Sequence, residues 1–270
     1  MAPQRAGSYI ALITILADPA SADDQAKMAH IQQLRKANDR AAARWAPHIT
    51  LVPPFDVNFN STASNPPRRT EGVASSSPAP PPYTSLHLPS ALGPGKPSYR
   101  LSESFRSRHP DGLCEALSQL EANVEAAVNA LSPPEDIVLD DIGFFPLSAY
   151  DTIHLRPSKT TAPQRNSTTS GRTTVWSLQA LIEDTVEQSG ARPTLSKRKR
   201  KQHHNFSPHL TLGQCNGEES RTALLASANA IIQNSPFRSK ADRLQLLFKP
   251  KERSGPYHVW REFQVGRPES

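Results

Sequence analysis

The stretch "RWAPHITLVPPF", residues 44–55, has a counterpart in "FSPHLTLGQC", residues 206–215. Both contain Pro-His-(Ile or Leu)-Thr-Leu, although one lies near the start of the chain and the other in its last quarter. Neighbouring side chains on a β-strand point to opposite faces, so each copy would send its aliphatic residues one way and its histidine and threonine the other. The repeat therefore predicts two similar strands, each with an apolar face and a polar face.

The polar faces of the two copies carry His48, Thr50, His209 and Thr211. Imidazole titrates near pH 6.5, so two histidines can supply both a base and an acid near neutral pH. Threonine hydroxyls can donate hydrogen bonds to phosphate oxygens, and an imidazolium can offset the charge that develops on them. If two lobes bring the copies together, the four residues suit the opening of a cyclic phosphodiester without a metal ion. A single His-x-Thr is typical of ordinary structural strands, but two copies with the same spacing favour a catalytic function.

The hydrophobic pattern predicts an α+β fold. The expected strands are residues 8–16, 48–52, 137–145, 152–156, 206–212, 244–248 and 257–265. The expected helices are residues 22–43, 113–131, 176–187 and 219–233. Each half of this order holds one copy of the repeat, so we expect a single bilobal domain over residues 1–270, with two pseudo-symmetric lobes that face a central cleft. Each lobe should hold a mainly antiparallel sheet with flanking helices, because short hairpins join several of the strands.

Three polar stretches interrupt this pattern. Residues 56–110 are rich in proline and serine and include "SSSPAPPPY", with no apolar periodicity. Such a segment buries too little apolar surface to offset the entropy lost on ordering, so we expect a disordered insertion there. Residues 157–174 and 190–204 are expected to form polar or basic loops. A scaffold that recruits a partner through the proline-rich insertion is an alternative reading of this segment.

Bulk composition excludes several classes of protein. The chain has 2 cysteines in 270 residues, too few for a disulfide scaffold, so we expect an intracellular, reducing location, either cytoplasmic or nuclear. The apolar run at residues 9–17 is too short to cross a membrane, and we expect no membrane partner. The net charge of +6 fits a polyanionic ligand, although part of the excess is local, in the basic residues 197–201.

Together, the two motifs resemble those of the 2H phosphoesterase superfamily, which includes 2′-5′ RNA ligase-like proteins and cyclic nucleotide phosphodiesterases. The stretches "DIVLDDIGFFP" at 136–146 and "YHVWREFQVG" at 257–266 also look like strands of that family. The resemblance implies a pseudo-twofold α+β fold, with His48 and His209 as the acid–base pair and Thr50 and Thr211 as phosphate ligands. It covers most of the chain except the insertion and the basic loop. The long insertion after the first motif departs from the family pattern and leaves the size of the substrate open.

Several aromatic residues and the remaining histidines lie outside the two motifs. Tyr9, Tyr257 and Trp260 are candidates for stacking on a base, as single-strand binders do, although core packing is expected for at least two of them. His154 is one of several scattered histidines that we expect to be structural. No histidine lies in a cluster that predicts a metal site, so no metal is expected.

Lys199 and Arg200 belong to the basic sequence "SKRKRKQHH", which directly precedes the second copy of the repeat. Cationic side chains beside a polyanion release counterions, so these two residues are candidates for contact with substrate phosphates. Residues 197–201 also resemble a nuclear localisation signal.

The expected function is a metal-independent phosphodiesterase that opens 2′,3′-cyclic phosphates on RNA ends or nucleotides by two-histidine acid–base catalysis. Such a ring arises only where a 2′-hydroxyl neighbours the phosphate, so the substrate would be RNA or a cyclic nucleotide. No cofactor is expected, and we expect a monomer. Two alternatives stay open: a non-catalytic module that binds RNA or a phosphorylated ligand, and a 2′-5′ RNA ligase-like activity.

Overall fold

The computed structural model describes residues 9–57, 111–147, 149–158, 173–190, 192–193, 207–251 and 257–266. Most of the predicted insertion 56–110 lies outside these residues, as does most of the basic loop 190–204. Asp56 and Val57 belong to a strand, although Asp56 and the residues after it were expected to form the insertion. Within the described residues, no helix is long and apolar enough to span a membrane.

A large antiparallel sheet organises the molecule, with the strand order β11-β10-β1-β3-β8-β6-β5. Its first half consists of β1 (Tyr9–Leu16), β3 (His48–Val57), β10 (Arg243–Pro250) and β11 (His258–Gln264). Its second half consists of β5 (Asp141–Pro146), β6 (Asp151–Arg156) and β8 (Leu210–Cys215). The short strand β7 (Arg192–Pro193) pairs with β3 outside this order. The halves join where β3 meets β8, so the two copies of the repeat lie on neighbouring strands.

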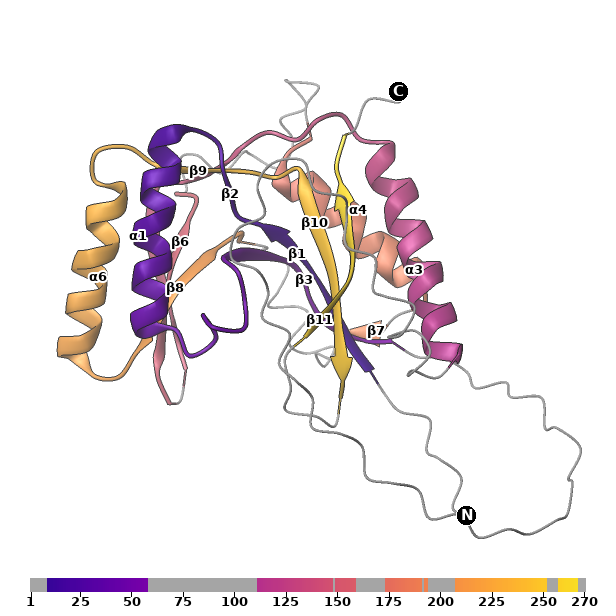
Figure 1. Ribbon diagram of the computed structural model, residues 1–270, viewed down its shortest axis with the longest axis horizontal. Helices are drawn as coiled ribbons and strands as arrows, with labels where there is room; N and C mark the ends of the chain where they lie inside the picture. Colours follow the sequence, from indigo (N-terminus) through magenta and orange to yellow (C-terminus); the bar gives the residue numbers. More distant parts are fainter. Residues whose placement is uncertain are drawn as a thin grey trace, which may run out of the picture.

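Two helices each cover the half of the sheet opposite to the one whose strands flank them in the sequence (Figure 1). Helix α1 (Ala22–Asn38) lies between β1 and β3 in sequence but packs against β8. Helix α4 (Val175–Gln188) lies between β6 and β8 in sequence but packs against β3. Helix α6 (Glu218–Ile232) completes the cover of β6 and β8, and α3 (Asp111–Asn129) packs against α4, β3 and β11. This arrangement confirms the predicted α+β fold with two related halves.

A second, smaller sheet pairs strands in the order β2-β9-β4. Its members are β2 (Asp18–Pro19), β9 (Phe237–Lys240) and β4 (Ile137–Leu139). The predicted single strand 137–145 was wrong, because the chain leaves this sheet at Leu139 and enters the large sheet at Asp141. Asp140 lies at the crossing, where its backbone N–H donates to the carbonyl of Arg156. The hydrophobic pattern runs through both strands and could not mark the change of sheet.

Strand β3 is longer than the sequence predicted. We expected Pro53 and Pro54 to end it, because proline has no N–H for the ladder. Instead the strand continues to Val57, and its register with β1 shifts between Ala11 and Ile13. A register shift takes up the residues that cannot donate, so both prolines remain within the strand.

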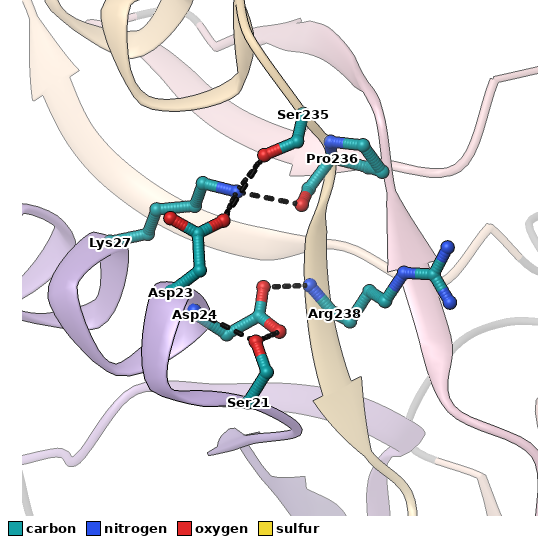
Figure 2. Close-up of polar contacts among 7 residues, drawn as sticks. All are labelled: Ser21, Asp23, Asp24, Lys27, Ser235, Pro236 and Arg238. Carbon is teal, nitrogen blue, oxygen red and sulfur yellow. Dashed lines mark hydrogen bonds and ion pairs between the residues drawn. The ribbon is translucent and has the colours of Figure 1, made fainter.

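The N-terminal turn of α1 is tied to the chain just before and within β9 (Figure 2). Ser21 caps the helix by accepting a hydrogen bond from the Asp24 backbone N–H. The Asp24 carboxylate, 2% exposed, accepts a hydrogen bond of 2.8 Å from the backbone N–H of Arg238. Lys27 pairs with Asp23 at 2.7 Å and also donates to the carbonyl of Pro236. These contacts hold α1 in place above β8, which carries one copy of the repeat.

Candidate active site

Both copies of the repeat show the predicted alternation of faces. His48, Thr50, His209 and Thr211 are all partly exposed. The aliphatic residues between them are at most 1% exposed: Ile49, Leu51, Leu210 and Leu212. We call the side of the sheet with the four polar residues the histidine face. The buried aliphatic residues fix the direction of both strands, and so both imidazoles point to the same side.

The pairing of β3 with β8 places the two motifs against each other. Ile49 lies directly opposite Leu210 in antiparallel register. Continuing that register by one residue in each direction sets His48 opposite Thr211 and Thr50 opposite His209. Side chains of directly opposed residues share a face of the sheet, so this register would put each histidine beside the threonine of the other copy.

Each histidine ring is held by the same local hydrogen bond. His48 Nδ1 donates to the carbonyl of Ala46 at 2.8 Å, and His209 Nδ1 donates to the carbonyl of Ser207 at 3.0 Å. Both acceptors lie two residues before the histidine, and a proline with a fixed φ angle separates them. A carbonyl can only accept, so the neutral ring carries its proton on Nδ1 and presents Nε2 as the basic atom. The proline of the repeat therefore takes part in orienting the imidazole.

Burial favours the neutral form of both rings. Burial is the main reason that the pKa of His48 is lowered from 6.5 to about 4, and the hydrogen bond to the Ala46 carbonyl acts in the opposite direction. The charges of Arg35 and His209 lower the pKa of His48 further, and Asp39 raises it. Burial also lowers the pKa of His209, again against the effect of a backbone carbonyl. The effect of His209 on the pKa of His48 means that a proton on His209 opposes the protonation of His48.

A third histidine belongs to the site, which the sequence did not indicate. His154 of β6 lies opposite Thr211, and its ring centroid is 5.0 Å from that of His209. The residue is only 1% exposed, and burial lowers its pKa to about 4. Its ring lies across Gly143, where a side chain would collide with it. His154 has no His-x-Thr pattern, so only the pairing of β6 with β8 reveals its position.

Aromatic rings flank both motif histidines. Trp45 lies 4.9 Å from His48 and 5.0 Å from Tyr257, measured between ring centroids. Phe145 lies 5.0 Å from His209 in an edge-to-face contact. Tyr257 is thus near the site, and its role in stacking on a base stays a prediction. Trp45 and Phe145 were missed because neither lies in the repeat.

The other candidates from the sequence lie elsewhere. Tyr9 is 8% exposed, and its ring packs against Phe248 on the core side of β1. Trp260 is 3% exposed, and its indole N–H donates to Glu121 of α3 at 2.9 Å. Core packing for two of the three aromatic candidates is thereby confirmed. Lys199 and Arg200 lie outside the described residues.

The histidine face continues as a row of polar residues across the first half of the sheet. Thr50 lies opposite Thr14, and Thr14 lies opposite Gln245, which donates a hydrogen bond to Glu262. Thr14 is 1% exposed, and its hydroxyl has no hydrogen-bond partner among the described residues.

In the part of the chain that the structure covers, no group of three or more His, Cys, Asp or Glu could hold a metal ion.

The fold and this site define a class of protein in which two similar halves each contribute one histidine and one threonine to a common face. A family model of the 2′-5′ RNA ligase superfamily matches residues 92–250, more than half of the 270-residue chain. The chain therefore belongs to the 2′-5′ RNA ligase superfamily, as the resemblance of its motifs to 2H phosphoesterases indicated. The matched range includes His209 and Thr211 but not the first copy of the repeat.

Solved structures give a distant likeness. E. coli LigT complexed with 3′-AMP is 12% identical with a TM-score of 0.43, and the match covers 96% of this chain and 99% of LigT. E. coli LigT complexed with NADP+ is 11% identical with a TM-score of 0.43, and the match covers 97% of this chain and 99% of LigT. A phosphoesterase is 13% identical with a TM-score of 0.42, and the match covers 96% of this chain and 99% of the phosphoesterase. No curated protein matches the chain.

Proposed function

We propose that this protein is a metal-independent phosphodiesterase that opens 2′,3′-cyclic phosphates on RNA ends or nucleotides. The observation that carries the proposal is the equivalence of His48 and His209 on neighbouring strands. Each ring has its Nδ1 tied to a carbonyl two residues earlier and its Nε2 available for proton transfer. Membership in the 2′-5′ RNA ligase superfamily supports phosphoester chemistry at this site.

The reaction needs one base and one acid, which the two imidazoles would supply. The neutral Nε2 of one histidine accepts a proton from water, and the water oxygen forms a bond to phosphorus. The bond from phosphorus to one ribose oxygen breaks, and that oxygen takes the proton from Nε2–H of the other histidine. The product is a ribose phosphomonoester with a free neighbouring hydroxyl. Each proton transfer contributes roughly 10²–10⁴-fold to the rate.

The threonines would bind the phosphate during this reaction. If the antiparallel register of Ile49 with Leu210 continues on both sides, Thr50 would lie beside His209 and Thr211 beside His48. Their hydroxyl groups can donate to the two non-bridging oxygens, where negative charge accumulates as water attacks. The assignment of base and acid is symmetrical in this geometry, so the two histidines can exchange roles when the direction of the reaction changes.

The direct test is a substrate panel assayed with EDTA present: 2′,3′-cyclic nucleotides, oligoribonucleotides with a cyclic end, and cyclic ADP-ribose phosphate. His48→Ala and His209→Ala should each reduce turnover by several decades while the far-UV circular dichroism stays native. His30→Ala, on the exposed surface of α1, is the matched control and should keep full activity. Near-full activity in either motif variant would refute the two-histidine mechanism.

The alternatives predict different outcomes of the same assay. A non-catalytic module would bind a 2′-phosphate product and turn over none of the substrates. A ligase-like activity would appear as formation of a 2′-5′ bond between an RNA with a cyclic end and an RNA with a free 5′-hydroxyl.

A further inference from the structure

We propose that two aromatic platforms beside the histidine pair bind two bases of one substrate. The preferred substrate is then the cyclic-phosphate end of an oligoribonucleotide, rather than a mononucleotide. This inference rests on the proposed function and specifies its substrate class. It comes from the aromatic rings that flank each motif histidine, which the two-histidine chemistry itself does not need.

The first platform is formed by Trp45 and Tyr257 beside His48. The two aromatic rings make an edge contact at 5.0 Å between centroids, and both residues are partly exposed. Lys249 Nζ lies 4.9 Å from the centre of the Tyr257 ring. Aromatic rings accept a base by stacking, and a cation beside them attracts the phosphate backbone.

Trp45 is positioned by a short network that begins at the end of α1. Arg35 and Asp39 form a buried ion pair at 2.9 Å, and the other oxygen of Asp39 accepts from the Ala41 backbone N–H at 2.8 Å. The backbone N–H of Trp45 then donates to the carbonyl of Ala41 at 3.0 Å. These hydrogen bonds fix the backbone of the segment between α1 and His48, which includes Trp45. A ring on which a base stacks needs such a fixed position.

The second platform is Phe145 of β5, beside His209. Its ring is stacked on His154 at 4.1 Å, yet the residue is 40% exposed. The adjacent Phe144 is also exposed, at 50%, but it faces the other side of β5, where Arg221 lies 5.8 Å from its ring centre. Phe145 thus presents aromatic surface on the histidine face and is supported from below by a buried side chain.

The order of these groups determines what they can bind. Trp45 contacts His48, Phe145 contacts His209, and β3 is the neighbour of β8. A phosphate held between the two imidazoles would have one platform on each side. A cyclic mononucleotide has one base and fills one platform, whereas an oligoribonucleotide end can fill both. Stacking is tolerant of sequence, because every base has an aromatic face, so we expect dependence on length more than on sequence.

The test compares kcat/KM for adenosine 2′,3′-cyclic phosphate with kcat/KM for the dinucleotide that carries the same cyclic end. The wild-type protein should prefer the dinucleotide by about tenfold or more, from the typical contribution of one stacked base. Phe145→Ala and Trp45→Ala should each bring this ratio close to one. Phe145→Tyr keeps a planar ring and should keep the preference. Phe144→Ala is the matched control, since it removes the neighbouring exposed ring from the opposite face.

The possible failures separate the inference from the proposed function. Equal kcat/KM for both substrates, or a ratio unchanged in Phe145→Ala, would overturn the platforms and leave the hydrolase intact. Absence of turnover with both substrates would overturn the proposed function. In that case the inference is tested by binding, with the affinities for the 2′-phosphate mononucleotide and dinucleotide measured by titration calorimetry. The dinucleotide should bind more tightly to the wild-type protein, and Phe145→Ala and Trp45→Ala should each remove this preference.

Discussion

Ile49 lies directly opposite Leu210, and this pair joins the two halves of the large sheet. Both residues are fully buried, whereas the histidine before each of them is partly exposed. A shift of the register by one residue would turn one histidine into the core, because side chains alternate along a strand. The apolar contact between the two repeats therefore decides that the polar residues beside them share one face.

Burial of the imidazoles predicts an acidic optimum for the enzyme. The pKa of His48 is lowered to about 4 and that of His209 is lowered below its ordinary 6.5, so both rings lose their protons before pH 7. The active form needs one protonated and one neutral ring, and it is most populated between the two pKa values. The kcat/KM profile should therefore be bell-shaped with its maximum below pH 6.5. A maximum above pH 7, or a flat profile, would contradict this assignment.

Thr50 and Thr211 offer a test of phosphate binding that leaves the histidines in place. Replacing either threonine by valine keeps the shape of the side chain but removes the hydroxyl donor. We expect a loss of about 10²-fold in kcat, typical of the removal of one donor to a developing oxyanion. Serine at the same position retains the hydroxyl and should keep most of the activity. Equal activity of the valine and serine variants would argue against a role for these hydroxyls.

Gly143 should be intolerant of any side chain. A Cβ at this position would lie 2.9 Å from Cε1 of His154 and even closer to Nε2, and the stacked ring of Phe145 limits the retreat of His154. Gly143→Ala should lower the free energy of unfolding by about 1–3 kcal/mol, the usual cost of overpacking. It should also reduce activity, since His154 contacts His209. Urea unfolding of Gly143→Ala, His154→Ala and the double variant provides the measurement.

The double variant distinguishes a local collision from a general effect. If the collision with His154 is the cause, His154→Ala should relieve most of the cost of Gly143→Ala, and the two changes will not be additive. Additive losses would mean that Gly143 is needed for another reason.

His154 should make the fold sensitive to acid. Burial is the main cause of its lowered pKa of about 4, with smaller lowering effects from His209 and Arg156 and an opposing effect from Asp141. The unfolded chain binds a proton near pH 6.5, whereas the folded chain binds it only near pH 4, so stability falls as the pH decreases through this window. The contribution is on the order of 3 kcal/mol at most.

Replacement of His154 removes this titration. His154→Gln should therefore lose less stability than the wild-type protein when urea unfolding at pH 7.5 is compared with unfolding at pH 4.5. The same loss in both proteins would show that the proton is taken up elsewhere.

Asp24 should stabilise the attachment of α1 (Figure 2). Its buried carboxylate accepts from the backbone N–H of Arg238, so Asp24→Ala would leave that donor without its acceptor. The expected cost is about 1–3 kcal/mol, measured by urea unfolding. Asp24→Asn keeps an acceptor and should cost less. Asp23→Ala is the matched control, because the Asp23 side chain is 68% exposed, and it should be the mildest of the three.

The expected elements were close to the observed ones where the signal is local. Helix 176–187 and helix 219–233 differ from α4 and α6 by one residue at each end, because the apolar stripe and the flanking turn residues both mark those boundaries. The strand predicted at 137–145 failed because a change of sheet at Asp140 leaves the hydrophobic pattern uninterrupted. Strand β9 was missed because only Phe237 and Ser239 of its four residues are buried, which is too short a pattern to recognise.

By itself the sequence determined the two repeated strands and which side chains share a face on each of them, because alternation is a property of a single strand. That was enough to name His48, Thr50, His209 and Thr211. Only the tertiary structure decided that β3 and β8 are neighbours, that His154 lies against His209, and that Trp45 and Phe145 flank the pair. Strand partners and ring contacts depend on how distant segments pack around a common core. A local sequence pattern does not predict that packing.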